Sequence, residues 1–401
     1  MKKLFYCILC LILGALSAQA ASVVRVTVEN PSALAQSNVP VVISAKQLAQ
    51  KASLKIVSAA VFVAQRQIAS QLDDLNRDGV PDELAFLVDL QPKQKLIVTI
   101  KVASDSSLYT NFTARTHAQM WKKDKIAKTI KPTVEESSPT GNLYQSLHHH
   151  GPAFESEYMA YRIYFDEKQT VDVYGKKKHQ LELMNTKWYP TVKQVAEGYG
   201  DDVLWAKATS GCGTLKGWDG SKAIHISPVT NRTARVLASG PVRSVVEMES
   251  DGWQYQGKTI DLKQRYIIYA GHRDVEVQVS QNESTTLVAG VQTFFDSSEK
   301  LTDIKGVVAI WGTGLPYPLT ENPRATPQTV GLAVSVPASI LKKSTSDSDN
   351  LLLLVEGKNY VYHLMAAWSQ EQGGFNQSKE FFDYVKNWNQ QLQTPVKVTI
   401  R

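Results

Sequence analysis

Residues 148–166 carry a dense set of side chains that can move protons or bind anions. The stretch contains three imidazoles, two glutamates, three phenols and one guanidinium, with a Gly-Pro break after the histidines. A histidine or tyrosine could remove a proton there, and another could protonate a departing oxygen. Arg162 could bind a carboxylate through two parallel hydrogen bonds. The stretch is therefore the first candidate for an active site.

The three consecutive histidines also permit a metal site. In an extended chain, His148 and His150 would face one way and His149 the other. The paired imidazoles could bind a transition metal together with Glu155 or Glu157. Each histidine could equally be an exposed or core-edge side chain without a chemical role.

Three tryptophans further along the chain lie near polar or glycine-rich segments. Trp188, Trp205 and Trp218 could stack on sugar rings, because an indole offers an apolar face and an N–H donor. Core packing is the competing interpretation for each of them. The nearby glycine-rich loops favour a cleft wall. The segment 210–220 is not a phosphate-binding loop, because it lacks the Gly-Lys-Ser/Thr ending.

A second motif, at residues 74–83, has the spacing of a calcium-binding loop. Oxygen-bearing side chains fall at its first, third, fifth and ninth positions, and a glycine takes the sixth. Ala85 stands at the twelfth position, where a bidentate acid is expected, and flanking helices are lacking. An Asp/Asn-rich turn without an ion is the alternative. We expect structural calcium and no organic cofactor. The expected ligands are Asp74, Asn76, Asp78, Val80 and Asp82.

The ends and the composition narrow the class of protein. Residues 1–20 have the charged, apolar and small-residue regions of a cleaved signal peptide, which predicts a periplasmic protein. Two of the three cysteines lie there, so Cys212 remains alone and an intrachain disulfide is excluded. The formal charge of +6, or 6 − 2 = +4 without Lys2 and Lys3, weakly favours anionic ligands. No motif indicates nucleic-acid binding or membrane insertion, and the oligomeric state is open.

Most of the chain alternates apolar and polar residues with a period of two, which is typical of half-buried antiparallel strands. Such strands recur at 24–28, 96–102, 161–165, 275–279 and 396–400. Helical spacing predicts one helix over 381–392, with Ser378 as its cap. We therefore expect a mainly β protein with few helices.

A change in composition divides the chain. Residues 104–147 mix Ser, Thr, Lys and Pro without a sustained period. We expect a small N-terminal β-sandwich at 21–105, a linker at 106–147 and a larger domain at 148–401. The last block is long for one sandwich and suits a large two-sheet fold.

Several motifs, in order, resemble a known family. The segments 149–152, 155–157, 160–165, 172–176 and 201–204 are similar to the domain-of-unknown-function family numbered 4861, and 74–84 resembles its N-terminal region. The resemblance covers nearly the whole mature chain. It implies a periplasmic protein encoded with polysaccharide-degrading enzymes. It also implies a large galactose-mutarotase-like β-supersandwich after the small domain.

The resemblance further implies a reaction on carbohydrate. A family member is thought to act in ulvan breakdown as an oligosaccharide dehydratase, a carbon–oxygen lyase that eliminates water from a terminal uronic acid. Elimination needs a base for the C5 proton, stabilisation of the carboxylate and an acid for the C4 oxygen. The expected catalytic residues are His149 or His150 as base or acid, Tyr161 or Tyr189 as partner, and Arg162 on the carboxylate. The expected substrate-binding residues are His148, Lys176, Trp188, Trp205 and Trp218.

Other functions remain open beside elimination of water or glycosidic β-elimination. A non-catalytic carbohydrate-binding protein could use the tryptophans as a platform. A mutarotase-like epimerase could use a histidine and a glutamate. A hydrolase using Glu155 and Glu157 is disfavoured, because the two would share one strand face, too close together for an attacking water.

Overall fold

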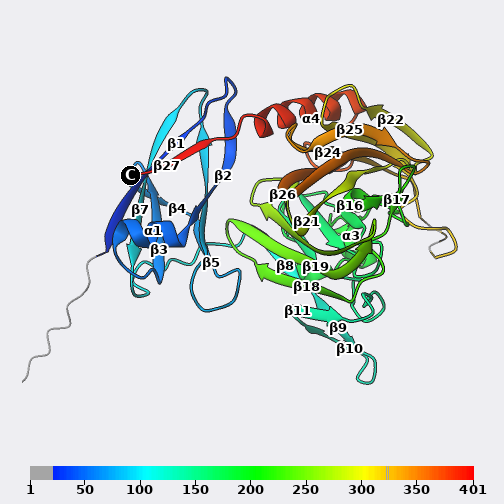
Figure 1. Cartoon of the computed structure of the whole chain (residues 1–401), viewed down its shortest axis with the longest axis horizontal. Helices are drawn as coiled ribbons and strands as arrows, with labels where there is room; N and C mark the ends of the chain where they lie inside the picture. Colours follow the sequence, from blue (N-terminus) through cyan, green and yellow to red (C-terminus); the bar gives the residue numbers. More distant parts are fainter. Residues whose placement is uncertain (1–20, 322, 324) are drawn as a thin grey trace, which may run out of the picture.

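The chain folds into two β domains that lie side by side (Figure 1). The computed structural model describes residues 21–321, 323 and 325–401. Strands dominate both domains, and the longest helix in the described residues has 15 residues. The prediction of a mainly β protein with few helices is confirmed. The predicted signal peptide falls on residues 1–20, which lie outside the described residues.

The N-terminal domain is a small β-sandwich. Val24, Val26 and Val28 are buried in its core while Arg25 is exposed, as the period of two predicts. Helix α1 (Ala45–Ala52) buries Leu48 against the same core. One sheet contains, in spatial order, β27 (Lys397–Ile400), β1 (Ser22–Glu29), β7 (Lys95–Ala103), β3 (Ser58–Val63) and β4 (Arg66–Ile68). The other contains β2 (Gln36–Ser44), β6 (Glu83–Leu90) and β5 (Ser70–Asp73).

The larger domain packs a five-stranded sheet against a twelve-stranded sheet. Phe154 and Tyr161 of the smaller sheet share one core cluster with Tyr266 and Tyr362 of the larger. The smaller sheet contains, in spatial order, β15 (Asp201–Asp202), β14 (Val171–Gly175), β13 (Met159–Ile163), β12 (Ala153–Ser156) and β8 (Thr116–Gln119). The main path of the larger sheet is β11 (Glu135–Ser138), β18 (Asn231–Ala238), β19 (Arg243–Tyr255), β20 (Lys258–Tyr269), β21 (Asp274–Gln292), β26 (Asn350–Trp368), β24 (Gln328–Ser335), β23 (Val307–Gly314) and β22 (Ser297–Leu301). Three strands pair beside this path: β16 (Cys212–Trp218), β17 (Ala223–Ile224) and β25 (Leu341–Ser346).

Helix α4 (Ser378–Leu392) covers the second face of the larger sheet. Phe381, Val385 and Trp388 pack in a cluster with Trp311 of β23 and Ala333 of β24. The helix predicted from apolar spacing is therefore confirmed, but the predicted cap is wrong: Gln377 is the N-cap and Ser378 is the first helical residue. Two short helices, α2 (Leu183–Thr186) and α3 (Val192–Ala196), lie in the connection between β14 and β15.

The domain boundaries differ from the predicted ones in two places. Residues 106–147, predicted to be a linker, contain β8, the hairpin of β9 (Trp121–Asp124) and β10 (Thr129–Pro132), and β11. Strand β8 joins the five-stranded sheet and β11 joins the large sheet. Each has only four residues, too few for a period of two to stand out. Strand β27 leaves the predicted 148–401 domain and pairs with β1, as the red end of the chain shows in Figure 1.

A buried ion pair joins the two domains. Arg243 of β19 is 1% exposed, and its guanidinium lies 2.7 Å from the carboxylates of both Asp73 and Glu83. A second contact places Nε2 of His272 at 2.8 Å from the carbonyl oxygen of Asn38. Charged groups removed from water need such partners, so Arg243 fixes the N-terminal domain against β19.

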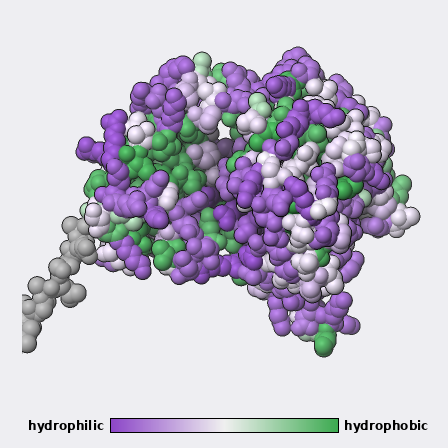
Figure 2. All heavy atoms as spheres, in the orientation of Figure 1, coloured by the Kyte–Doolittle hydropathy of each residue, from purple (hydrophilic) through white to green (hydrophobic). Residues whose placement is uncertain are grey.

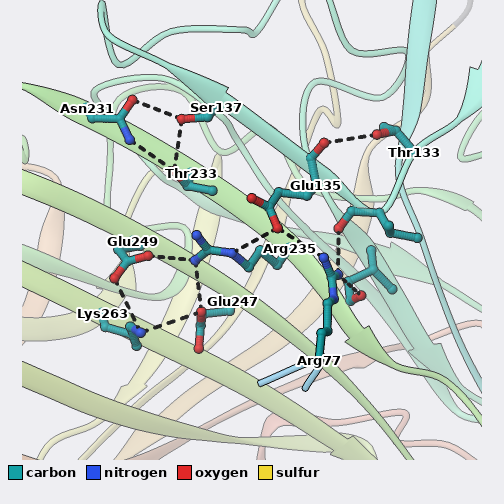
Figure 3. Close-up of polar contacts among 12 residues, drawn as sticks. Arg77, Thr133, Glu135, Ser137, Asn231, Thr233, Arg235, Glu247, Glu249 and Lys263 are labelled. Carbon is teal, nitrogen blue, oxygen red and sulfur yellow. Dashed lines mark hydrogen bonds and ion pairs between the residues drawn. The ribbon is translucent and has the colours of Figure 1, made fainter. Parts of the chain in front are cut away.

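Further along the same face of β19, the larger sheet carries a more exposed network of ion pairs (Figure 3). Arg235 pairs with Glu135 of β11 and with Glu247 and Glu249 of β19, at 3.2, 3.1 and 2.6 Å. Arg77, from the β5–β6 connection, also binds Glu135, at 3.0 Å. The network therefore ties β11 and an N-terminal loop to the same sheet.

The surface differs between the two domains in the view of Figure 2. Hydrophilic residues cover most of the larger domain, and hydrophobic residues gather on the N-terminal domain. The exposed apolar residues of that domain include Val23, Val42, Ile97 and Val398. Within the described part of the chain, none of the helices has the length and apolar character needed to span a membrane.

We expect Arg243→Ala to lower the free energy of unfolding by about 3–5 kcal/mol, because it leaves Asp73 buried without its cation. Arg235→Ala is the matched control. It should cost about 1 kcal/mol or less, because Glu135 and Glu249 are partly exposed and the buried Glu247 keeps Arg265 at 2.9 Å. Urea unfolding followed by fluorescence measures both. Equal losses would contradict the role of Arg243 at the domain interface.

Candidate active site

A polar cavity of about 300 Å³ opens beside β15, at the edge of the five-stranded sheet. Four residues singled out from the sequence line it: His150, Arg162, Tyr189 and Trp205. The cavity is also lined by Tyr144, Tyr164, Lys168, Asp202, Lys207 and Tyr317. These side chains come from β13, β15 and five connecting segments, so the fold gathers them from distant parts of the sequence.

The guanidinium of Arg162 is the centre of the hydrogen-bond network under the cavity. Arg162 on β13 lies directly opposite Asp172 on β14 in the antiparallel register. Its Nε and Nη2 donate to Oδ2 of Asp172 at 3.0 and 2.6 Å. Nη2 also donates to Oδ2 of Asp202 at 2.9 Å, and Nη1 donates to the hydroxyl of Tyr189 at 3.1 Å.

Two aspartates share this single guanidinium. Oδ2 of Asp172 also accepts from the hydroxyl of Tyr164 at 2.6 Å, and its Oδ1 accepts from a main-chain N–H at 2.9 Å. Oδ2 of Asp202 accepts from Nε1 of Trp188 at 2.9 Å, whereas its buried Oδ1 has no hydrogen-bond partner among the described residues. Burial and the negative charge of Asp172 raise the pKa of Asp202 to about 8.

The imidazole of His150 is neutral, and its tautomer is fixed. Nδ1 lies 2.8 Å from the carbonyl oxygen of Tyr144, and because a carbonyl only accepts, Nδ1 carries the hydrogen. Nε2 therefore carries a lone pair. Burial lowers the pKa of His150 to about 4. The ring stacks on that of Tyr144 with centroids 3.9 Å apart, which holds it at the cavity.

The backbone around the cavity adopts strained conformations. His150, Lys187, Trp188 and Lys207 have φ angles of 69°, 48°, 79° and 45°. Positive φ is uncommon outside glycine and is an outlier for a residue as bulky as Trp188. Next to His150, a Cβ on Gly151 would lie 1.8 Å from a carbonyl oxygen at the end of β13. Such strain concentrates at functional sites and persists because the surrounding packing imposes it.

Two residues that line the cavity, Trp205 and Lys207, contact Phe294. The rings of Trp205 and Phe294 meet edge to face with centroids 5.5 Å apart. Nζ of Lys207 lies 4.1 Å from the centroid of Trp205 and 3.2 Å from that of Phe294. Lys168 is paired with Asp166 at 2.9 Å, whereas Lys207 has no ion-pair partner in the described part of the chain. Lys207 is therefore available to an anionic ligand.

Two predicted catalytic residues are not brought to the cavity. His149 is fully buried, and burial lowers its pKa to about 3. The hydroxyl of Tyr161 donates to the carbonyl oxygen of Arg273 and accepts from the amide of Ala366, inside the core. Neighbouring residues of a strand face opposite ways, so Tyr161 cannot share the cavity with Arg162.

Two predicted binding residues lie close to the cavity without lining it. The ring of His148 meets that of Tyr189 edge to face, with centroids 5.5 Å apart. Trp188 is fully buried, and its ring lies 4.4 Å below Cζ of Arg162. With its hydrogen bond to Asp202, Trp188 therefore supports the site instead of stacking on a sugar.

Two other predicted binding residues lie elsewhere. Lys176 is buried in an ion pair with Glu155, which also accepts from two main-chain N–H groups. Trp218 packs against a separate apolar cluster of the large sheet. Glu157 pairs with Arg115, so neither glutamate of the stretch joins a histidine in a metal site. The charge of Lys176 and the ring of Trp218 therefore stabilise the fold, because both side chains are buried.

Sequence reasoning missed the residues that other strands supply. Asp172 interrupts an otherwise apolar, fully buried strand, and that is a signal that could have marked it. Asp202 lies in one of the family-like segments but was not singled out. Lys207 and Tyr144 carry no local signal, because only the fold brings them to His150.

The calcium-like loop connects β5 to β6, and its acidic side chains accept main-chain hydrogen bonds. Asp74 accepts two N–H groups of the loop at 3.1 and 2.7 Å, and Asp82 accepts two others at 2.7 and 3.1 Å. In the described residues, no three or more His, Cys, Asp or Glu side chains are arranged to hold a metal ion. Calcium therefore stays a prediction, with the ligands Asp74, Asn76, Asp78, Val80 and Asp82.

The chain belongs to the family described as Domain of unknown function (DUF4861). The family model matches residues 28–398, which is nearly the whole chain. The resemblance drawn from the ordered motifs is therefore confirmed. No curated protein matches the chain.

Two solved structures align with most of the chain at low identity. A protein in glycosyl hydrolase family 38 from Enterococcus faecalis has 9% identity and a TM-score of 0.48, with 94% of this chain and 47% of that one covered. An alpha-mannosidase from Enterococcus faecalis V583 has 9% identity and a TM-score of 0.46, with 94% and 46% covered. The chain thus spans about half the length of these structures.

We expect calcium to raise the midpoint of thermal unfolding, because a divalent cation would relieve the repulsion among the three loop carboxylates. At a concentration 100-fold above Kd, binding would add about 2.7 kcal/mol to the free energy of unfolding. Asp78→Ala should abolish the response. Asp124→Ala should keep it, although that residue also accepts loop N–H groups. A midpoint indifferent to calcium would leave the loop as an Asp-rich turn without an ion.

Proposed function

We propose that the protein is a periplasmic enzyme that acts on uronic acid residues of oligosaccharides, by eliminating water or by cleaving through β-elimination. The observation that carries the proposal is the neutral imidazole of His150 in a polar cavity that also holds Lys207, a cation without an ion-pair partner among the described residues. The resemblance of the ordered motifs to a family with a dehydratase member supports it.

His150 is suited to removing the C5 proton. Its pKa of about 4 leaves the imidazole unprotonated at neutral pH, with a lone pair on Nε2. When Nε2 takes the proton, the carbonyl of Tyr144 still accepts from Nδ1 and stabilises the imidazolium that forms.

The carboxylate beside C5 needs stabilisation while negative charge develops on it. Lys207 would supply a positive charge. Tyr189 accepts from Nη1 of Arg162, so its own hydroxyl hydrogen is free to donate to the ligand. Arg162 thus acts through Tyr189 as a positioning residue, and this differs from the direct contact with the carboxylate expected from the sequence.

Trp205 offers the ring that would stack on a sugar. It lines the cavity beside Lys207, so an apolar sugar face and a carboxylate would be recognised on one wall. This combination of stacking and charge favours an anionic oligosaccharide over a neutral one.

We expect the protein to convert members of a panel of uronic acid oligosaccharides to unsaturated products, read by the absorbance of the conjugated uronate. His150→Gln should lower kcat/KM by about 100-fold or more, because it removes the base. Protonation of His150 removes the lone pair, so wild-type activity should fall as the pH drops through about 4. His117→Gln, on β8 at the opposite edge of the sheet, is the matched control and should keep full activity.

Absence of product across the whole panel would contradict elimination. Oligosaccharide binding that His150→Gln leaves unchanged, without any product, would favour a non-catalytic carbohydrate-binding protein. Interconversion of sugar epimers without absorbance would favour an epimerase.

We expect Lys207→Met to weaken binding of a uronate oligosaccharide by about tenfold, or 1.4 kcal/mol, because the carboxylate loses its cation. Binding of the same oligosaccharide with its carboxyl group reduced to an alcohol should change little. Titration calorimetry with both ligands measures this, with the exposed Lys193→Met as control. Equal weakening for both ligands would assign Lys207 to packing instead of charge recognition.

A further inference from the structure

The geometry points to Asp202 as the proton donor of the cavity: its carboxyl group holds a hydrogen on Oδ1 and gives it to the C4 oxygen that leaves the uronic acid. The identity of that oxygen rests on the proposed elimination. The protonation of Asp202 rests on the buried network alone and can be measured separately.

The buried network has one cation for two carboxylates. Asp172 receives three donors on Oδ2 and one on Oδ1, whereas Asp202 receives two, both on Oδ2. If both were ionised, the site would hold an uncompensated negative charge away from water, which is costly. The carboxyl group with fewer donors therefore keeps the proton, and that group is Asp202.

Within the described part of the chain, the surroundings of Asp202 add no second cation to the buried network. The charged and titratable groups that face it are Arg162 on β13, Tyr164 after β13, Asp172 on β14, Asp201 on β15, Tyr189 after α2 and Tyr317 after β23. Arg162 is already bound to Asp172, and the others are acids or phenols. Together they disfavour ionisation of Asp202.

The two donors decide which oxygen carries the hydrogen. Nε1 of Trp188 and Nη2 of Arg162 both point at Oδ2, each at 2.9 Å. Oδ1 is buried and has no partner among the described residues, although the side chain lines the cavity. The hydrogen therefore sits on Oδ1, and its delivery to a ligand requires a small movement that exposes this oxygen to the cavity.

The step balances with His150 and Asp202 alone. Nε2 of His150 takes the C5 proton, and the electrons of the C5–H bond form the C4–C5 double bond. The C4–O bond breaks, and its oxygen takes the hydrogen from Oδ1 of Asp202 to leave as water. The site is left with an imidazolium and a carboxylate, and solvent returns the proton from His150 to Asp202 between turnovers.

The first test uses Asp202→Asn and two leaving groups. Asparagine keeps an oxygen for Trp188 and Arg162 but lacks an acidic hydrogen. With a uronate whose C4 hydroxyl leaves as water, kcat/KM should fall by about 100-fold or more. With the 4-fluoro analogue the loss should be below about tenfold, because fluoride leaves without a full proton transfer. A purely structural role for Asp202 would slow both substrates equally.

The second test does not depend on activity. Infrared difference spectra of the wild type should show the carbonyl band of a protonated carboxyl group, which disappears as the pH rises through about 8. Asp202→Asn should lack this band, and the exposed Asp219→Asn should retain it. Trp188→Phe removes a donor that favours the ionised form, so it should move the titration to higher pH.

A protonated Asp202 should also make the free energy of unfolding depend on pH. The folded pKa of Asp202 is raised above that of an unfolded aspartate, so the folded state binds the proton more tightly. The free energy of unfolding should therefore fall as the pH rises from about 4 to about 8, and less so in Asp202→Asn.

An infrared band that persists in Asp202→Asn, or equal rate losses for the two leaving groups, overturns the assignment. If the wild type converts no uronate, the proposed elimination fails, while the infrared titration still decides whether Asp202 holds the proton.

Discussion

The site depends on a guanidinium that is buried inside a β-sheet. A cation removed from water must be neutralised, and Arg162 achieves this with Asp172 directly across the strand pair. Because this ion pair holds Arg162 in place, its guanidinium donates to the hydroxyl of Tyr189 and to Oδ2 of Asp202. The ring of Trp188 packs beneath the same guanidinium. The positions of the cavity side chains therefore follow from a charge-balance requirement in the sheet below.

The period of two was sufficient to predict the mainly β fold, because apolar and polar residues alternate along each half-buried strand. It was not sufficient to predict which side chains of the 148–166 stretch face the cavity and which face the core. Tyr161 and Arg162 are neighbours, and their opposite faces could be assigned only once the large sheet was known to cover one of them. Asp172 and Asp202 reach the site through strand register, which the local sequence does not contain.

His150 shows how much of a site depends on the main chain. Its positive φ and the absence of a side chain at Gly151 let the chain pass close to the end of β13. The same passage brings Nδ1 to the carbonyl of Tyr144, and so selects the tautomer. Histidine content alone suggested a metal centre, whereas the backbone path holds this imidazole with its hydrogen on Nδ1 and its lone pair on Nε2.

Strand β27 pairs with β1 and becomes the edge strand of the N-terminal sheet. While the protein is being synthesised, β1 has a neighbour on only one side, and its free edge stays unpaired until residue 400 has been made. An incomplete sheet with an open edge is a weak structure and prone to pair with other chains. The first domain is thus completed only after the second has been synthesised. A truncated chain would leave the N-terminal sheet without β27.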